Sequence, residues 1–151
     1  MNVVPSEYDE CVAFVDWLRL NDIPHAHYGN ESQSGTKNAM IRGAKLKRIG
    51  QSRGVFDYDV YVPIKGITGD VDCYELIKIE MKRQRGGTVS EYQKKWQKIY
   101  DQAGIPNRIC KGADEAIKFV EEYLNAGQDD VYWNQSQFVL AYWLALLLKH
   151  T

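Results

Sequence analysis

Two stretches of alternating apolar and polar residues, 55–62 and 73–81, most constrain how this chain can fold. In the first stretch the even positions form one face and the odd positions the other. The even positions hold Phe56, Tyr58, Val60 and Val62, and the odd positions hold Asp57, Asp59 and Tyr61. The second stretch places Ile77, Ile79 and Met81 on one face and Leu76, Lys78, Glu80 and Lys82 on the other. Period-two alternation predicts half-buried strands, and the glycine-rich turn at 65–70 makes them a hairpin.

Helices are predicted on both sides of this hairpin. Ser6, with Asp9 three residues later, resembles a capping box and precedes apolar residues at helical spacing, which predicts a helix over 7–20. Ser90 and Gln93 repeat this pattern and predict a helix over 91–103. A short edge strand at 24–28, a strand at 107–111 and a helix ending near 125–127 complete the order α-β-β-β-α-β-α. Residues 29–54, rich in Gly, Ser, Asn and Gln, predict a long loop.

Length, cysteine content and the apolar segments narrow the class of protein. A length of 151 residues with 44% hydrophobic content predicts one compact domain. Three cysteines without ligand spacing argue against a disulfide framework and a structural zinc site. The acidic N-terminus has no apolar segment of signal-peptide length, so we expect an intracellular, cytoplasmic protein. The apolar run Phe138–Leu148 has eleven residues, about half of what a bilayer span needs, and follows polar residues 134–137. We therefore expect no membrane partner.

Charge is strongly segregated along the chain, although the net charge is only -1. Residues 1–31 contain six acids and one arginine, whereas residues 32–56 contain six bases and no acid. Residues 82–111 are again basic, with eight bases and two acids. A fold that brought the two basic blocks together would have a face suited to nucleic-acid phosphates. The alternative is two unrelated solvated charge runs.

Strand parity also predicts a chemical site. Glu80 and Lys82 are two residues apart, so their Cα atoms lie about 6.6 Å apart on one strand face. Asp57, from the preceding strand of the hairpin, adds a second carboxylate. Two acids with open coordination positions suit Mg²⁺, and a nearby lysine can orient water or offset phosphate charge. The alternative is an ordinary exposed ion pair.

The order and spacing of several motifs make the chain resemble the PD-(D/E)XK nucleases, and more narrowly the VRR-NUC family of standalone phage or bacterial nucleases. The resemblance runs from about Ser6 to Leu124. Its motifs are Glu7 and Glu10, Gly54-Val55-Phe56-Asp57, Ile79-Glu80-Met81-Lys82, Ser90-Glu91-Tyr92-Gln93 and Gly112-Ala113-Asp114-Glu115-Ala116. It implies an α/β, restriction-endonuclease-like core with a mixed central sheet in α-β-β-β-α-β order, followed by an added C-terminal helical segment.

The resemblance also implies roles for individual residues. Asp57 and Glu80 would bind Mg²⁺, with Mn²⁺ as the alternative, and Lys82 would orient water or offset charge. Asp59 remains the alternative to Asp57, because the family has proline before its aspartate and this chain has Phe56. Gln93 is either an active-site residue or only a helix cap.

The first-helix acid of the family pattern is assigned to Glu7, with Glu10 as the alternative. Glu7 lies four and seven residues before Cys11 and Phe14, which puts it on the apolar helix face. An unpaired carboxylate would be costly to bury there, which favours a functional role.

These features lead to one main hypothesis and one alternative. The chain is expected to be a Mg²⁺-dependent endonuclease that hydrolyses phosphodiester bonds in DNA, and the resemblance implies branched DNA such as four-way junctions. The expected phosphate contacts are Lys37, Arg42, Lys45, Lys47, Arg48 and Arg53. A non-catalytic DNA-binding module with the same fold is the alternative.

The last part of the chain leads to an expectation about assembly. Residues 1–127 would form the nuclease domain and residues 128–151 an apolar helical extension. The extension would either pack on its own domain or form part of a homodimer interface, and we expect the homodimer.

Overall fold

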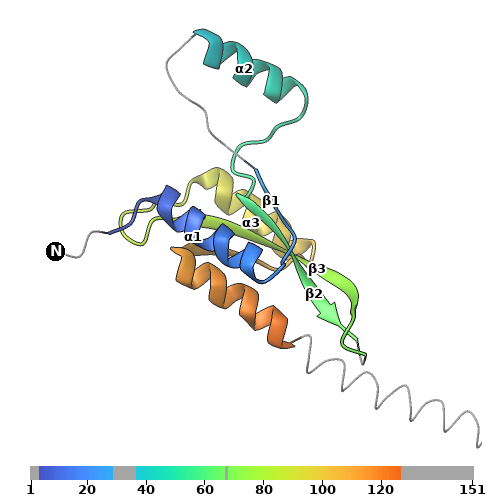
Figure 1. The fold of residues 1–151 in the computed structure, drawn as a ribbon. Helices are drawn as coiled ribbons and strands as arrows, with labels where there is room; N and C mark the ends of the chain where they lie inside the picture. Colours follow the sequence, from blue (N-terminus) through green and yellow to red (C-terminus); the bar gives the residue numbers. More distant parts are fainter. Residues whose placement is uncertain (1–3, 29–36, 67, 127–151) are drawn as a thin grey trace, which may run out of the picture.

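The chain folds around a four-stranded mixed sheet (Figure 1). The structure is a computed structural model that describes residues 4–28, 37–66 and 68–126. The strands lie in the order β1 (His25–His27), β2 (Tyr58–Lys65), β3 (Val71–Lys82) and β4 (Asn107–Lys111). β1–β2 and β2–β3 are antiparallel, and β4 is parallel to β3. The predicted α/β class, the mixed sheet and the β2–β3 hairpin are thus confirmed.

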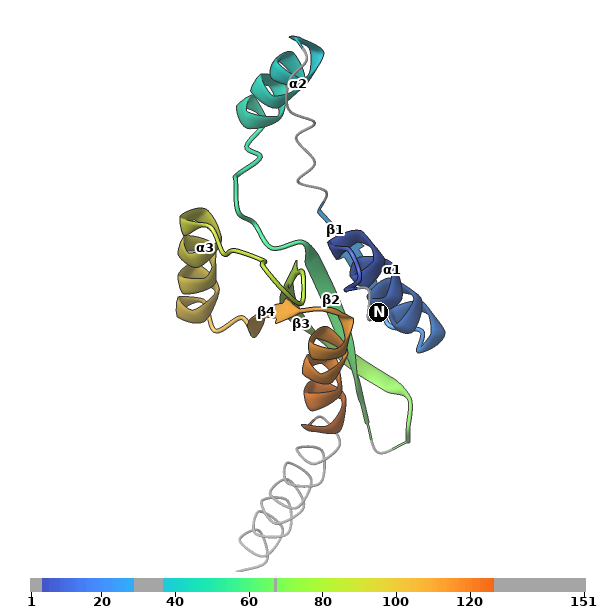
Figure 2. The same cartoon turned by 90° about the vertical axis from the view of Figure 1, so that its left-hand side faces the viewer.

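Helices lie on both faces of the sheet (Figure 2). α1 (Glu7–Leu20) and a helix over residues 113–126 pack on one face, and α3 (Glu91–Gln102) lies on the other. Both predicted capping boxes are present. The Ser6 hydroxyl accepts from the Asp9 N–H at 3.1 Å, and the Ser90 hydroxyl accepts from the Gln93 N–H at 3.2 Å. Because each box satisfies backbone donors at the helix start, it fixes where the helix begins.

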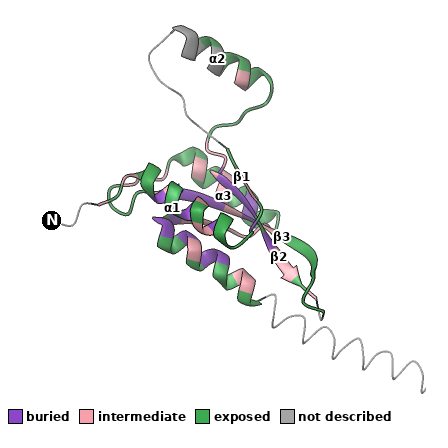
Figure 3. Ribbon diagram, in the orientation of Figure 1, coloured by how far each residue is buried: buried purple, intermediate pink, exposed green. Residues whose placement is uncertain are grey.

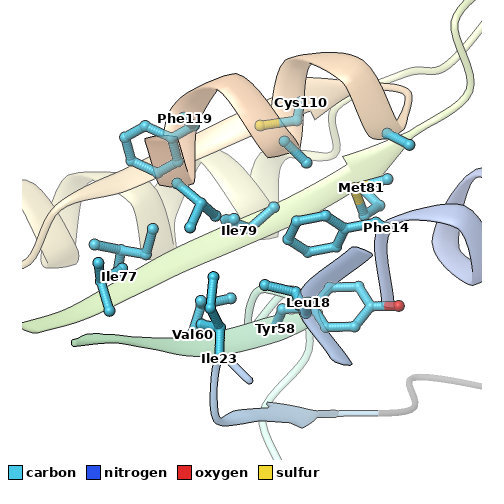
Figure 4. Packing of buried hydrophobic residues seen from close by; sticks show 14 residues of the cluster. Phe14, Leu18, Ile23, Tyr58, Val60, Ile77, Ile79, Met81, Cys110 and Phe119 are labelled. Carbon is cyan, nitrogen blue, oxygen red and sulfur yellow. The ribbon is translucent and has the colours of Figure 1, made fainter. Parts of the chain in front are cut away.

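The core lies between the sheet and the α1 side, where the buried residues gather (Figures 3 and 4). Ile77, Ile79 and Met81 of β3 are fully buried there, as their alternation predicted. They pack with Phe14 and Leu18 of α1. Ala116, Phe119 and Val120 of the helix over 113–126 complete this core. One face of the hairpin is therefore fixed in apolar packing, and its other face is left for polar chemistry.

The prediction that residues 29–54 form only a loop is wrong, because α2 (Lys37–Arg48) lies within this range. Its sequence is rich in Ala, Met, Leu, Lys and Arg, which favour helices. Figures 1 and 2 both show α2 standing apart from the sheet. The helix was missed because its helix-favouring residues lie in a range that is otherwise rich in Gly, Ser, Asn and Gln.

The start of the first hairpin strand was also predicted wrongly. β2 begins at Tyr58 instead of Val55, and Phe56 does not share a face with Tyr58. The Phe56 ring packs on the ring of Tyr100 in α3, with 5.1 Å between their centroids. The Tyr58 ring packs on the ring of Phe14 in α1, with 5.5 Å between their centroids. The chain bends at Asp57, whose carboxylate accepts a hydrogen bond from the Met81 N–H at 3.0 Å. A side chain thus takes the place of the strand's backbone pairing at this point.

The apolar run Phe138–Leu148 lies outside the described residues, so its predicted helix is not tested. In the part of the chain that the structure describes, no helix has the length and apolar character to cross a membrane.

Candidate active site

Glu80 stands at the centre of a small polar cluster where β3 ends. Its carboxylate is 1% exposed. The Lys82 Nζ lies 2.5 Å from Glu80 Oε1, and the Gln93 side-chain N–H₂ donates to the same oxygen. Lys82 comes from the same strand face and Gln93 from the first turn of α3. The structure therefore brings three of the five residues expected at the site into direct contact.

Gln93 caps α3 and also contacts Glu80. Its Oε1 accepts from the Ser90 N–H at 2.8 Å, which caps α3, while its nitrogen donates to Glu80. One amide can do both because it has an acceptor and donors on separate atoms. The capping box thus positions a donor on the buried carboxylate.

Asp57 lies close enough to Glu80 for the two charges to interact. Burial, and then the Asp57 charge, raise the pKa of Glu80 to about 7, and Lys82 opposes this shift. Burial also raises the pKa of Asp57 above its ordinary value, with the Met81 N–H and Lys82 acting in the opposite direction. Two carboxylates in a partly dry site repel each other, and a cation placed between them would relieve that repulsion.

Asp59 is held in a different cluster. It pairs with Lys78, and its Oδ2 accepts from the Tyr28 hydroxyl at 2.9 Å. Lys78 Nζ also lies over the Tyr28 and Tyr100 rings, at 5.5 and 5.4 Å from their centroids. Because Asp59 is already neutralised and bonded, the geometry favours Asp57 as the aspartate next to Glu80. The pairing of Lys78 with Asp59 was not predicted, although the two residues are direct partners in the hairpin register.

The expected environments of the two first-helix acids are reversed. Glu7 was expected on the buried apolar face of its helix, but it is exposed, whereas Glu10 is 5% exposed. The buried stripe of α1 consists of Glu10, Phe14 and Leu18. Glu10 Oε2 accepts from the Ala113 N–H at 2.7 Å and so caps the helix over 113–126. Glu7 contributes to the raised pKa values of Asp57 and Glu80, which places its charge near both.

The donor set at this site fits a hard divalent cation. Glu80 Oε2 is buried and has no hydrogen-bond partner among the described residues, although a buried carboxylate oxygen normally has one. Asp57 and Glu80 carry carboxylate oxygens, the type of ligand that Mg²⁺ prefers. Within the described ranges no group of three or more Asp, Glu, His or Cys side chains is arranged to hold a metal. Two protein carboxylates would leave the other coordination positions to water and substrate.

The basic segment that contains α2 is attached to the body next to this cluster. Residues 37–54 are called the basic arm below. The Trp96 indole N–H donates to the Arg53 carbonyl at 3.0 Å, and Gly54 has φ +78°. A Cβ at Gly54 would lie 2.6 Å from the backbone of Tyr92, so only glycine allows this close approach. The arm therefore rejoins the body at the residue before Gln93.

The structure describes the side chains of four of the six bases that were expected to contact phosphate. Lys45, Lys47, Arg48 and Arg53 are exposed. Lys37 and Arg42 belong to α2, but their side chains are not among those described. No acid lies within α2 or between it and Gly54. The exposed bases thus form one positively charged arm that begins beside the carboxylate cluster.

Comparisons with solved structures show a likeness to a nuclease-type domain. A solved structure described as a VRR_NUC domain protein superposes with a TM-score of 0.59, covering 80% of this chain and 89% of the other, at 19% sequence identity. No family model and no curated protein matches the sequence. At this level of identity the likeness establishes a shared fold.

Proposed function

We propose that the chain is a metal-dependent endonuclease that hydrolyses phosphodiester bonds in DNA. The single observation that carries this proposal is the buried Glu80 carboxylate, held by Lys82 and Gln93 beside Asp57, with one oxygen left without a partner among the described residues. A structural ion pair would not need a second carboxylate in the same buried place, because like charges there are costly. The fold shared with a VRR_NUC domain protein supports the same function.

Each side chain then has a defined task. Asp57 and Glu80 would hold Mg²⁺, with Mn²⁺ as the alternative metal, and a cation there polarises the phosphate and makes bound water a better nucleophile. Lys82 places a positive charge next to Glu80, where it can orient water or offset charge on the phosphate. Gln93 fixes the orientation of Glu80. Glu7 is exposed and its charge acts on both Asp57 and Glu80, so it would assist metal or water binding there.

The basic arm would hold the DNA. Its bases contact phosphates and position the substrate without reading sequence. Branched DNA such as a four-way junction is proposed as the substrate because of the VRR-NUC resemblance of the motifs. A phage or bacterial cytoplasmic origin is proposed on the same ground.

Cleavage assays test this function directly. Supercoiled plasmid, linear duplex and a synthetic four-way junction would be incubated with the protein in Mg²⁺, in Mn²⁺ and in EDTA. We expect cleavage only with metal and fastest on the junction. Tight binding without cleavage in either metal would instead support the non-catalytic DNA-binding module.

Neutralising part of the basic arm should reduce the salt dependence of DNA binding. For the triple variant with Ala at Lys45, Lys47 and Arg48, the slope of log K against log salt should change by about 0.9 for each duplex phosphate that the arm no longer binds. Fluorescence anisotropy at several salt concentrations in EDTA measures this slope. Ala at Lys65 and Lys118, exposed bases outside the arm, provides the control. An unchanged slope in the triple variant would show that these three bases do not contact DNA phosphates.

A homodimer is proposed for the full chain. The run Phe138–Leu148 is apolar all round and too large to leave exposed on a monomer. Residues 128–151 would therefore contribute to a two-fold interface, and two sites related by a dyad could address two strands of a junction. Light scattering at micromolar concentration should give twice the mass of 17.4 kDa. A monomer would refute the dimer, and a dimer that survives removal of residues 128–151 would refute the role of that segment.

A further inference from the structure

The connection between β3 and α3 carries two arginines immediately after Lys82. Arg83 and Arg85 are exposed, and neither forms an ion pair within the described residues. No acid occurs from Lys82 to Ser90. The next acid, Glu91, is 2.8 Å from Lys94 and thus already has a partner. Residues 83–87, called the arginine turn here, therefore carry two positive charges without an ion-pair partner among the described residues, directly after Lys82 of the carboxylate cluster.

The arginine turn is packed in place on both sides. Residues 84–86 form a turn in which Gly86 has φ +76°, a conformation that favours glycine. A Cβ at Gly87 would lie 3.1 Å from the Lys82 Cβ, so the turn folds back against the proposed catalytic lysine. On the other side, a Cβ at Gly112 would lie 2.9 Å from Gln84 Cγ. The turn is thus held between Lys82 and the start of the helix over 113–126.

This packing fixes the backbone positions from which the two arginine side chains extend. Consecutive Cα atoms are about 3.8 Å apart, so Arg85 starts no more than about 11 Å along the chain from Lys82. A guanidinium matches phosphate oxygens with paired hydrogen bonds, which makes arginine the usual side chain for this contact. Arginines that are exposed, without an ion-pair partner in the described chain and attached to a packed turn are suited to a ligand that carries several negative charges in a row. A polynucleotide next to Lys82 is such a ligand.

We propose that the arginine turn binds a DNA phosphate that neighbours the scissile one, as a contact separate from the basic arm. The proposal rests on the proposed nuclease function. Figures 1 and 2 show α2 standing well away from the connection between β3 and α3, so the two basic elements can hold different phosphates of one substrate.

Binding of a duplex oligonucleotide in EDTA tests the proposal without cleavage. The variant Arg83→Ala/Arg85→Ala should bind roughly tenfold or more weakly at physiological salt, and its log K against log salt slope should change by about 0.9 for each phosphate no longer bound. Arg83→Lys/Arg85→Lys should restore the slope, because the charge remains, but only part of the affinity, because the paired hydrogen bonds are absent. Lys118→Ala, an exposed base on the helix over 113–126, is the control.

The outcomes separate this proposal from the proposed function. A wild-type slope and affinity in Arg83→Ala/Arg85→Ala would overturn the arginine turn as a binding element, even if the wild-type protein cuts DNA. A reduced slope would support it, even if the wild-type protein binds without cutting. Circular dichroism confirms that the variants are folded, and the Lys pair supplies a second folded variant if the Ala pair is not.

Discussion

Replacing Glu80 by Gln should reduce DNA cleavage by about a thousandfold or more while the protein still binds DNA. The substitution keeps the size of the side chain and an oxygen for Lys82, but it removes the charge that would hold the metal. Metal stabilisation of a phosphoryl transition state is worth several kcal/mol, and each 1.36 kcal/mol is about tenfold in rate. Initial rates of junction and plasmid cleavage, measured at several Mg²⁺ concentrations, give the size of the reduction.

Two further variants make the result specific. Lys82→Ala should also abolish detectable cleavage, because it removes the positive charge next to Glu80. Glu91→Gln removes a charge from the same end of α3 but from an exposed pair, so it should cut at nearly the wild-type rate. If Glu80→Gln retained cleavage within threefold of the wild type, the site assignment would be wrong.

Glu80→Gln should also make the metal-free protein more stable than the wild type at pH 8. The pKa of Glu80 is raised from its usual 4.5 to about 7 in the folded protein, chiefly by burial. Between these two pH values the folded state binds a proton that the unfolded state has released. The free energy of unfolding of the wild type should therefore fall as the pH rises from about 4.5 through 7, by on the order of 3 kcal/mol. Glu80→Gln carries no such charge and should show much less of this pH dependence.

Urea unfolding in EDTA at pH 5, 6, 7 and 8 measures the effect for wild type, Glu80→Gln and the control Glu91→Gln. Asp57 also has a raised pKa, so a smaller slope of the same sign should remain in Glu80→Gln. Equal pH dependence of the free energy of unfolding in the wild type and Glu80→Gln would show that the charge of the buried Glu80 carboxylate does not destabilise the folded protein. If Glu80→Gln is both inactive and more stable than the wild type, the buried Glu80 carboxylate is kept for its chemistry and not for stability.

The elements that bury apolar faces could be predicted from sequence, because burial leaves a period in the residues. Alternation indicated the faces of β3, and capping boxes indicated the starts of α1 and α3. α2 could not be predicted in this way. Its residues lie in a range rich in Gly, Ser, Asn and Gln, which predicts a loop, and its Ile41 is 55% exposed instead of buried in the core.

The candidate site was predictable to the extent that it follows from strand parity. Glu80 and Lys82 share a face because they are two residues apart, and this needed no structure. Glu7 and Glu10 share the first turn of α1, and the face that is buried there includes Glu10, which accepts from the Ala113 N–H 103 residues away in sequence. The bend at Asp57 is likewise accompanied by a hydrogen bond from the Met81 N–H, 24 residues away in sequence. Such long-range contacts leave no local pattern in the sequence.

The two ends of the segment that contains the basic arm meet at one place, and this makes the segment exchangeable. The Tyr28 N–H donates to the Asp57 carbonyl at 2.7 Å, so the chain leaves and re-enters the domain at neighbouring residues. Closing a loop costs only about 0.6 kcal/mol more for each doubling of its length. Segments of other lengths and charges could therefore be grafted between Tyr28 and Gly54 with little effect on stability. Under the proposed function, this attachment point is where the DNA preference would be re-engineered while the carboxylate cluster stays unchanged.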